Sequence, residues 1–144
     1  MFAANCQYDL ASQIQVKENT ILRCSNRVGS RLNITHDGDG VLLQASSGSE
    51  NYNAIENCEV ILPDTSTGRA VVAIGNYGHI RNMQVSGGSA NSWAINMDRT
   101  NIWELTNINV GGAGDFSWRG SGIRYQISDK LGSPFNFGDS LLQK

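Results

Sequence analysis

A six-residue pattern that returns twice at a fixed interval is the strongest constraint on the fold of this chain. It reads IENCEV at residues 55–60, IRNMQV at 80–85 and LTNINV at 105–110, so the interval is 25 residues both times. Each copy begins with an aliphatic residue, has Asn in the third position and ends with Val. A period in the twenties with short strand-like units is typical of a solenoid whose repeats stack on each other.

The same pattern predicts which side chains stack. The first, fourth and sixth positions of the three copies are apolar and should form interior ladders. A flat strand would alternate strictly, so the chain must turn at Asn57, Asn82 and Asn107. There, Asn tolerates the left-handed conformation, and its side-chain amide can bond to the Asn of the turns above and below.

Outside these copies, apolar residues come in short period-2 bursts separated by clusters of Gly, Ser, Asp and Asn. This alternation favours strands joined by tight turns. The exception is the first dozen residues, where Phe2, Cys6 and Leu10 fall at a helical spacing and predict a short capping helix. We expect an all-β parallel β-helix of about five coils, with strands stacked about 4.8 Å apart.

This repeat pattern resembles the right-handed, single-stranded parallel β-helix of the pectin-lyase-like superfamily, which includes pectate lyases, polysaccharide hydrolases and bacteriophage tailspikes. The three copies of the repeat span residues 55–110, and looser bursts extend the resemblance to residues 14–127. We therefore expect a cap or lead-in segment over 1–13, the β-helix over 14–127, and a tail or oligomer-contact segment over 128–144.

Composition and charge exclude several classes of protein. A net charge of −2 gives no basic surface for nucleic acid, and no apolar run approaches the length of a membrane span. The three cysteines, Cys6, Cys24 and Cys58, show no CxxC spacing, so we interpret them as small buried apolar residues and expect no metal or cofactor. No signal peptide is visible at the start of the sequence, so we expect either a protein that stays inside the cell until it is released by lysis or a sequence that begins after a removed segment.

Carboxylates are the first candidates for chemistry. Asp98 and Asp115 follow adjacent predicted strands, and glycoside hydrolysis needs two carboxyl groups across the scissile bond. Asp37 and Asp39 lie in a Gly-spaced loop beside His36. That loop could ligate a cation or supply a carboxylate pair, but Asp-Gly is also a turn dipeptide, and we favour the turn.

Aromatic side chains are the second group of candidates, because sugars bind against flat rings. Trp118 lies in a Gly-bounded polar segment, and Tyr77 and His79 lie in a second loop. Trp103 either points inward, as its parity with Leu105 indicates, or contacts a ligand.

A regular repeat, low charge and no convergent catalytic set favour a structural or receptor-binding segment of a tailspike, fibre or similar surface-adhesion protein. We expect it to contact a polysaccharide or cell-surface glycan, to form a homotrimer, and to be part of a virion or extracellular. The alternative is a polysaccharide lyase or glycoside hydrolase that uses Asp98, Asp115, and also Asp37 or Asp39, along the groove of the β-helix. For a lyase, an Arg base could come from Arg99, Arg119 or Arg124.

Overall fold

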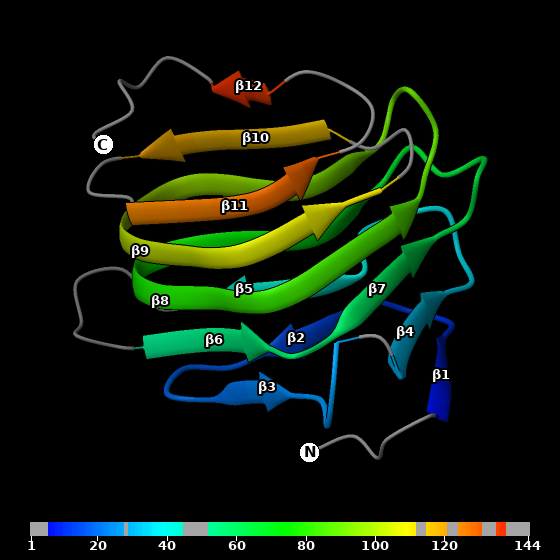
Figure 1. Cartoon of the computed structure of the whole chain (residues 1–144), viewed down its shortest axis with the longest axis horizontal. Coiled ribbons are helices and arrows are strands. Elements are labelled where there is room, and N and C mark those ends of the chain that lie inside the picture. Colours follow the sequence, from blue (N-terminus) through cyan, green and yellow to red (C-terminus); the bar gives the residue numbers. More distant parts are fainter. Residues whose placement is uncertain are drawn as a thin grey trace.

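The chain folds as a parallel β-solenoid of about 4 turns, which confirms the all-β prediction with a slightly lower number of turns. The computed structural model describes residues 6–27, 29–44, 52–111, 115–120, 124–130 and 135–137. For residue 76, for 98–102 and from 115 onward, only the backbone is described. Figure 1 shows the turns stacked from the N-terminal to the C-terminal end.

Strands account for most of the described residues. They are β1 (Cys6–Leu10), β2 (Ile14–Val16), β3 (Ile21–Arg23), β4 (Ser30–Ile34), β5 (Val41–Gln44), β6 (Tyr52–Glu56), β7 (Glu59–Leu62), β8 (Arg69–Gly87), β9 (Trp93–Val110), β10 (Asp115–Gly120), β11 (Arg124–Lys130) and β12 (Phe135–Phe137).

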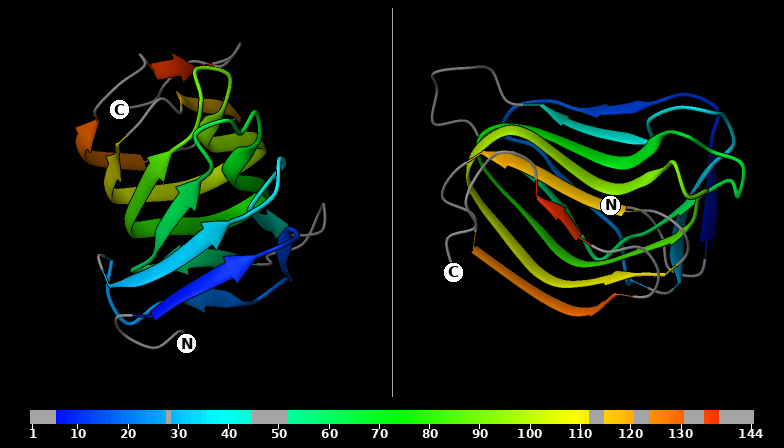
Figure 2. Two further views of the ribbon diagram at one scale, coloured as in Figure 1. Left: turned by 90° about the vertical axis from the view of Figure 1, so that its right-hand side faces the viewer. Right: turned by 90° about the horizontal axis from the view of Figure 1, so that it is seen from above.

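The strands stack in rows, and every pair between neighbouring turns is parallel. One row begins with β1, β4 and β7, a second with β2 and β5, and a third with β3 and β6. The long strands β8 and β9 bend and pass through all of these rows. Strand β10 continues the β2–β5 row and β11 pairs with β9, as the end-on view in Figure 2 shows.

The predicted interior ladders are present. Ile55, Ile80 and Leu105 are aligned on successive turns, as are Val60, Val85 and Val110. Met83 is aligned with Ile108, and all of these side chains, with Cys58, are buried in one apolar core. Burial of stacked aliphatic side chains is the main favourable term for such a fold, at about 25 cal/mol per Å² of apolar surface.

An Asn ladder occupies the bend after the β3–β6 row, as the sequence predicts. Asn57, Asn82 and Asn107 have φ angles of 60°, 48° and 54°, in the left-handed region. Asn82 Nδ2 donates to Asn57 Oδ1 at 3.1 Å, and Asn107 Nδ2 donates to Asn82 Oδ1 at 2.8 Å. Arg27 Nη1 donates to Asn107 Oδ1 at 3.2 Å, so a cation from the first turn ends the ladder.

The predicted N-terminal capping helix is wrong, because Cys6–Leu10 is strand β1. It pairs with β4, with Tyr8 aligned to Leu32 and Leu10 aligned to Ile34. The spacing of Cys6 and Leu10 by four residues suits both a helix and a strand, since four is a multiple of the strand period of two. Packing of Tyr8 and Leu10 against the core decides in favour of the strand.

The interpretation of all three cysteines as small buried apolar residues is also wrong. Cys24 and Cys58 are buried but form a disulfide with a Cα–Cα distance of 5.1 Å, and Cys6 is free and exposed. Cys24 occupies the bend of the first turn: its backbone N–H donates to Glu56 O as that of Asn57 donates to Arg81 O. The disulfide therefore joins two neighbouring turns where the Asn ladder does not reach.

We predict that Asn82→Ala lowers the free energy of unfolding by about 2 kcal/mol, because the variant loses both amide contacts and strains the left-handed backbone. Asn82→Gly keeps the backbone conformation and should lose about half as much. Urea denaturation followed by tryptophan fluorescence measures both. Equal stability of the Ala variant and the wild type would contradict the role of the ladder.

We predict that the double variant Cys24→Ala/Cys58→Ala lowers the free energy of unfolding by about 2–4 kcal/mol, since the disulfide closes a long loop of the unfolded chain. Cys6→Ala is the matched control and should stay within about 0.5 kcal/mol of the wild type. Thermal unfolding with and without reductant provides the measurement. A reductant effect of the same size on the double variant would mean that another bond is responsible.

Candidate functional site

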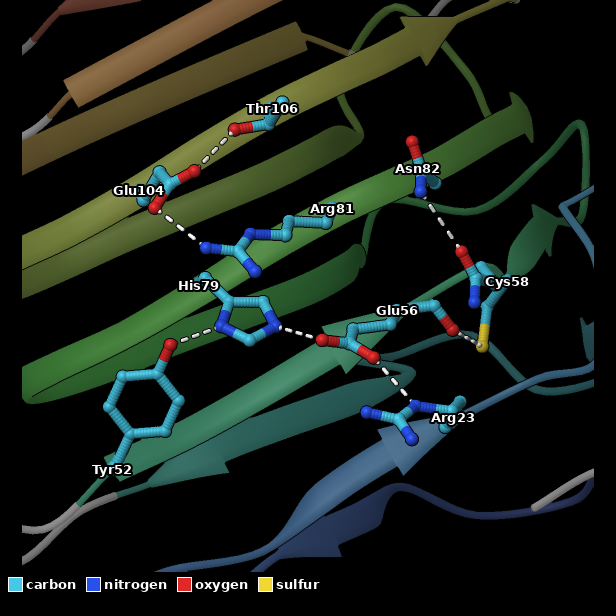
Figure 3. A network of polar contacts seen from close by, with 10 residues as sticks. Arg23, Tyr52, Glu56, Cys58, His79, Arg81, Asn82, Glu104 and Thr106 are labelled. Atoms are coloured by element: carbon cyan, nitrogen blue, oxygen red, sulfur yellow. Dashed lines mark hydrogen bonds and ion pairs between the residues drawn. The ribbon is translucent and has the colours of Figure 1, made fainter.

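The most developed polar cluster among the described residues lies on the outer surface of the β3–β6 row. We call it the charged face, and Figure 3 shows it from close by. It consists of Arg23, Tyr52, Glu56, His79, Arg81, Glu104 and Thr106.

Strand alternation explains why these side chains share one surface. Ile55, Ile80 and Leu105 point into the core, so the residues on either side of each point outward. Parallel register then stacks them: Glu56 is aligned with Arg81, and His79 with Glu104. Residues that are far apart in the sequence therefore meet across neighbouring turns.

One half of the charged face is a chain of contacts through His79. The Tyr52 hydroxyl is hydrogen-bonded to Nδ1 of His79, and the two rings meet edge to face with centroids 5.4 Å apart. On the other side, His79 Nε2 is hydrogen-bonded to Glu56 Oε1 at 2.5 Å. The second oxygen of Glu56 accepts from Arg23 Nε at 2.6 Å.

The other half is an ion pair with a hydroxyl partner. Arg81 Nη2 donates to Glu104 Oε2 at 2.8 Å, and Thr106 Oγ1 donates to Glu104 Oε1, also at 2.8 Å. The two arginines and two glutamates balance each other in charge. The face is thus polar and internally neutralised.

Burial and charge set the protonation states. His79 is only 4% exposed, and burial lowers its pKa, an effect that outweighs the opposing contact with Glu56. Burial alone would raise the pKa of Glu56, but hydrogen bonds from Arg23 and His79 outweigh it and the pKa is lowered. The hydrogen bond from Arg81 lowers the pKa of Glu104. At neutral pH, His79 is neutral and both carboxyl groups are ionised.

Tyr52 is the exposed aromatic residue of the charged face, with 39% of its surface accessible. Its backbone N–H donates to Asn19 Oδ1 at 3.2 Å, which fixes the start of β6. Partial burial raises the pKa of the Tyr52 phenol, so the hydroxyl keeps its proton at neutral pH.

The aromatic residues singled out from the sequence lie in different surroundings. His79 belongs to the charged face, and Tyr77 is half-buried and aligned with Tyr52 on the next turn. Trp103 is 1% exposed and lies in the core, where its Nε1–H donates to Gly75 O at 3.0 Å. A Cβ on Gly78 would lie 2.6 Å from the Trp103 ring, so Gly78 makes room for the indole.

The structure places Trp118 on β10, with its backbone aligned with Met97 and Phe137. Its side chain is outside the described residues, so its contact with a ligand stays a prediction.

The backbone register does not bring Asp98 and Asp115 together. Asp115 is aligned with Trp93, whereas Asp98 is aligned with Arg119. Five residues of strand separate Trp93 from Asp98, or roughly 16 Å at about 3.3 Å per residue. Carboxyl pairs of glycoside hydrolases are about 5 to 9.5 Å apart. The side chains of both residues are outside the described part of the structure.

The Asp37–Asp39 loop binds its own neighbours on the next turn. Asp37 Oδ1 accepts from the backbone N–H of Thr67 at 2.9 Å. Asp39 accepts from Arg69 Nε at 2.8 Å, and these contacts lower the pKa of Asp39 against the opposing effect of burial. Both carboxylates thus stabilise the stacking of two loops.

A shallow pocket of about 440 Å³ lies on the β2–β5 row and the residues that follow β2. Its lining consists of exposed polar side chains: Gln15, Lys17, Glu18 and Gln44. Gln15 Nε2 donates to Gln44 Oε1 at 3.0 Å. None of these four side chains is buried, so the pocket is a weaker candidate for a binding site than the charged face.

Sequence reasoning missed most members of the charged face. Arg23, Tyr52, Glu56 and Arg81 are not candidates from the sequence, and Glu104 is there only one of several carboxylates of the later turns. A signal was present, since the second position of the repeat holds Glu56 and then Arg81, which have opposite charges and stack on neighbouring turns.

No family model matches the chain, and no curated protein or solved structure matches it either. Within the described ranges, no helix is long and apolar enough to cross a membrane, and no group of three or more His, Cys, Asp and Glu side chains could hold a metal ion. The function therefore has to be inferred from the charged face itself.

We predict that the free energy of unfolding falls as the pH is lowered from 7. His79 has a lowered pKa, so its stabilising contribution is present above its ordinary value of 6.5 and is lost as the pH falls below it. Glu56 and Glu104 also have lowered pKa values, and their contributions are lost below their ordinary value of 4.5.

Urea titrations at several pH values test this directly. His79→Gln should remove most of the pH dependence in the mildly acidic range, and His36→Gln is the matched control. A protein that becomes more stable between about pH 7 and pH 5 would contradict the assignment.

Proposed function

We propose that this chain is a glycan-binding β-helical segment of a tailspike, fibre or similar surface-adhesion protein. The observation that carries the proposal is the charged face, an array of hydrogen-bonding groups fixed on rigid strands around the exposed ring of Tyr52.

The chemistry of the charged face suits a carbohydrate. Sugar hydroxyl groups need both donors and acceptors, and arginine and carboxylate side chains supply them. Arg81 and Glu104 are both substantially exposed while bonded to each other, so a ligand meets groups that are already oriented. Orientation before binding lowers the entropic cost of association. The exposed face of the Tyr52 ring offers an apolar surface for a pyranose ring.

Binding is favoured over glycoside hydrolysis by the protonation states of the charged face. A hydrolase of this type needs one carboxyl group with a raised pKa that donates a proton to the leaving oxygen. Here the pKa values of Glu56 and Glu104 are both lowered. The lyase and hydrolase alternative would have to rest on Asp98 and Asp115, whose backbones are far apart, or on Asp37 and Asp39, which bond to the neighbouring loop.

A location on a virion or outside the cell is supported by the Cys24–Cys58 disulfide. Disulfides persist on virions and in extracellular space and are rare in the cytosol. The parallel β-solenoid is consistent with a β-helix fold, and a β-helix is what the resemblance of the repeat to tailspikes implies. Within the described residues, β1, β2 and β3 pair on one side only, which leaves a strand edge that another chain could cover in a homotrimer.

We expect the purified protein to bind a subset of bacterial polysaccharides on a glycan array. Tyr52→Ala and Arg81→Ala should each weaken binding by about tenfold or more, since each removes a central contact. Gln15→Ala, on the β2–β5 row, is the matched control and should bind as the wild type does. Equal weakening in all three variants, or new reducing ends or unsaturated uronides from the bound glycans, would count against this proposal.

Light scattering after size-exclusion chromatography tests the homotrimer. The expected mass is three times the 15.6 kDa of the chain. A soluble, stable monomer would remove the trimer from the proposal.

A further inference from the structure

His79 determines whether the hydroxyl proton of Tyr52 points inward or outward. Glu56 is ionised and can only accept a hydrogen bond, so His79 Nε2 must carry the proton that it shares with Glu56. In neutral His79, Nδ1 then has a lone pair and can only accept. The hydroxyl proton of Tyr52 must therefore point at Nδ1, away from the surface.

This arrangement fixes the polarity of Tyr52 toward a ligand. With its only proton directed at the ring below, the hydroxyl oxygen presents lone pairs to the outside and acts as an acceptor. A sugar hydroxyl can donate to it. A carboxylate, which has only lone pairs, cannot bond to it and is repelled.

A proton on His79 reverses this polarity. Both ring nitrogens of the imidazolium are donors, so Nδ1–H now donates to the Tyr52 oxygen. The Tyr52 proton must rotate outward, where it can bond to a ligand acceptor. The heavy atoms need not move, because only the direction of one hydrogen bond changes.

We propose that Tyr52 and buried His79 form a specificity element in which protonation of His79 converts the Tyr52 hydroxyl from acceptor to donor, so that the charged face gains affinity for carboxylate-bearing glycans in mildly acidic conditions. This inference rests on the proposed glycan-binding function and names its ligand class and its regulation.

The charged groups around His79 permit this change. Glu56 on β6 contacts Nε2 directly, and Glu104 on β9 is aligned with His79, so two carboxylates favour its positive charge. Arg81 on β8 opposes the charge but is bonded to Glu104, and Arg23 on β3 is bonded to Glu56. On β11, the strand that pairs with β9, the backbone of Arg124 is aligned with Glu104.

His79 has the ordinary pKa nearest to neutrality in this cluster, 6.5, and burial lowers it. Glu56 and Glu104 have an ordinary pKa of 4.5, and both are held below it by their hydrogen bonds. Because both carboxylates are bonded to arginines, we expect them to stay ionised when His79 gains its proton. The face then carries one additional positive charge and one additional outward donor.

Nuclear magnetic resonance tests the hydroxyl reversal without any glycan. The chain has 2 histidines, so His36→Gln leaves His79 as the one imidazole signal. At neutral pH we expect a protonated Nε2 and an unprotonated Nδ1 in the ¹⁵N spectrum. On acidification, the ¹³Cζ signal of Tyr52, assigned with Tyr52→Phe, should shift with the same midpoint as His79. The opposite tautomer, or a Tyr52 signal that ignores the His79 titration, would overturn the inference.

Calorimetry with polygalacturonate and dextran tests the consequence for binding. Between about pH 7.5 and pH 5, the affinity of the wild type for polygalacturonate should rise at least about threefold, and that for dextran should change little. Tyr52→Phe separates the two causes, because it keeps the new charge and lacks the donor. It should show a clearly smaller rise, and His79→Gln should show none.

The outcomes separate the two proposals. If Tyr52→Phe gains as much affinity as the wild type, charge alone acts and the hydroxyl reversal is wrong. Magnetic resonance could show the reversal while neither polysaccharide binds at either pH and no glycan of the array binds the protein. In that case the glycan-binding function is wrong and the hydroxyl reversal is right.

Discussion

The structure depends on the turn that the chain makes at Asn57, Asn82 and Asn107. A left-handed backbone is costly for most residues, and Asn tolerates it because its short amide side chain can bond locally. Here the amide bonds to the Asn of the next turn instead, so the same residue bends the strand and fixes its register with the neighbouring turn. This register and the constant repeat length align Ile55 with Ile80 and Val60 with Val85. Without that register, neither the core nor the charged face would form.

The repeated part of the fold could be predicted from the sequence, whereas the first turn could not. Within residues 55–110, each position has an equivalent on the next turn, so the interior ladders and the bends follow from the pattern. Before residue 55 the repeat is irregular, and Cys24 stands where later turns have Asn. Without that alignment, the spacing of 34 residues between Cys24 and Cys58 gives no sign of a disulfide. In Val71-Val72-Ala73-Ile74, both strand faces are apolar, so alternation alone could not show that Val71 and Ala73 join the core.

The candidate site was harder to predict because it is built across turns. The sequence predicts a loop at His79, yet the residue is buried on strand β8 with its side chain between those of Tyr52 and Glu56. Trp103 looks like a residue that could bind sugar until the space that Gly78 leaves for it on the turn below is known. Both outcomes depend on which residue lies one turn below, and this information requires the register. The charges of Glu56 and Arg81 would have indicated the site once the repeats were placed on top of each other.

The continuous pairing of the two long strands β8 and β9 determines how such a molecule can change in length. They pair along nearly their whole course, from Arg69 against Trp93 to Val85 against Val110, and strand pairing joins each turn only to its neighbours. In a linear array of this kind, stability is close to a sum of unit and nearest-neighbour terms. Duplication of one complete repeat would lengthen the array and add another row of outward side chains, leaving the existing rows in register. Loss of a single residue within a repeat would instead move every later side chain of that strand to the opposite surface.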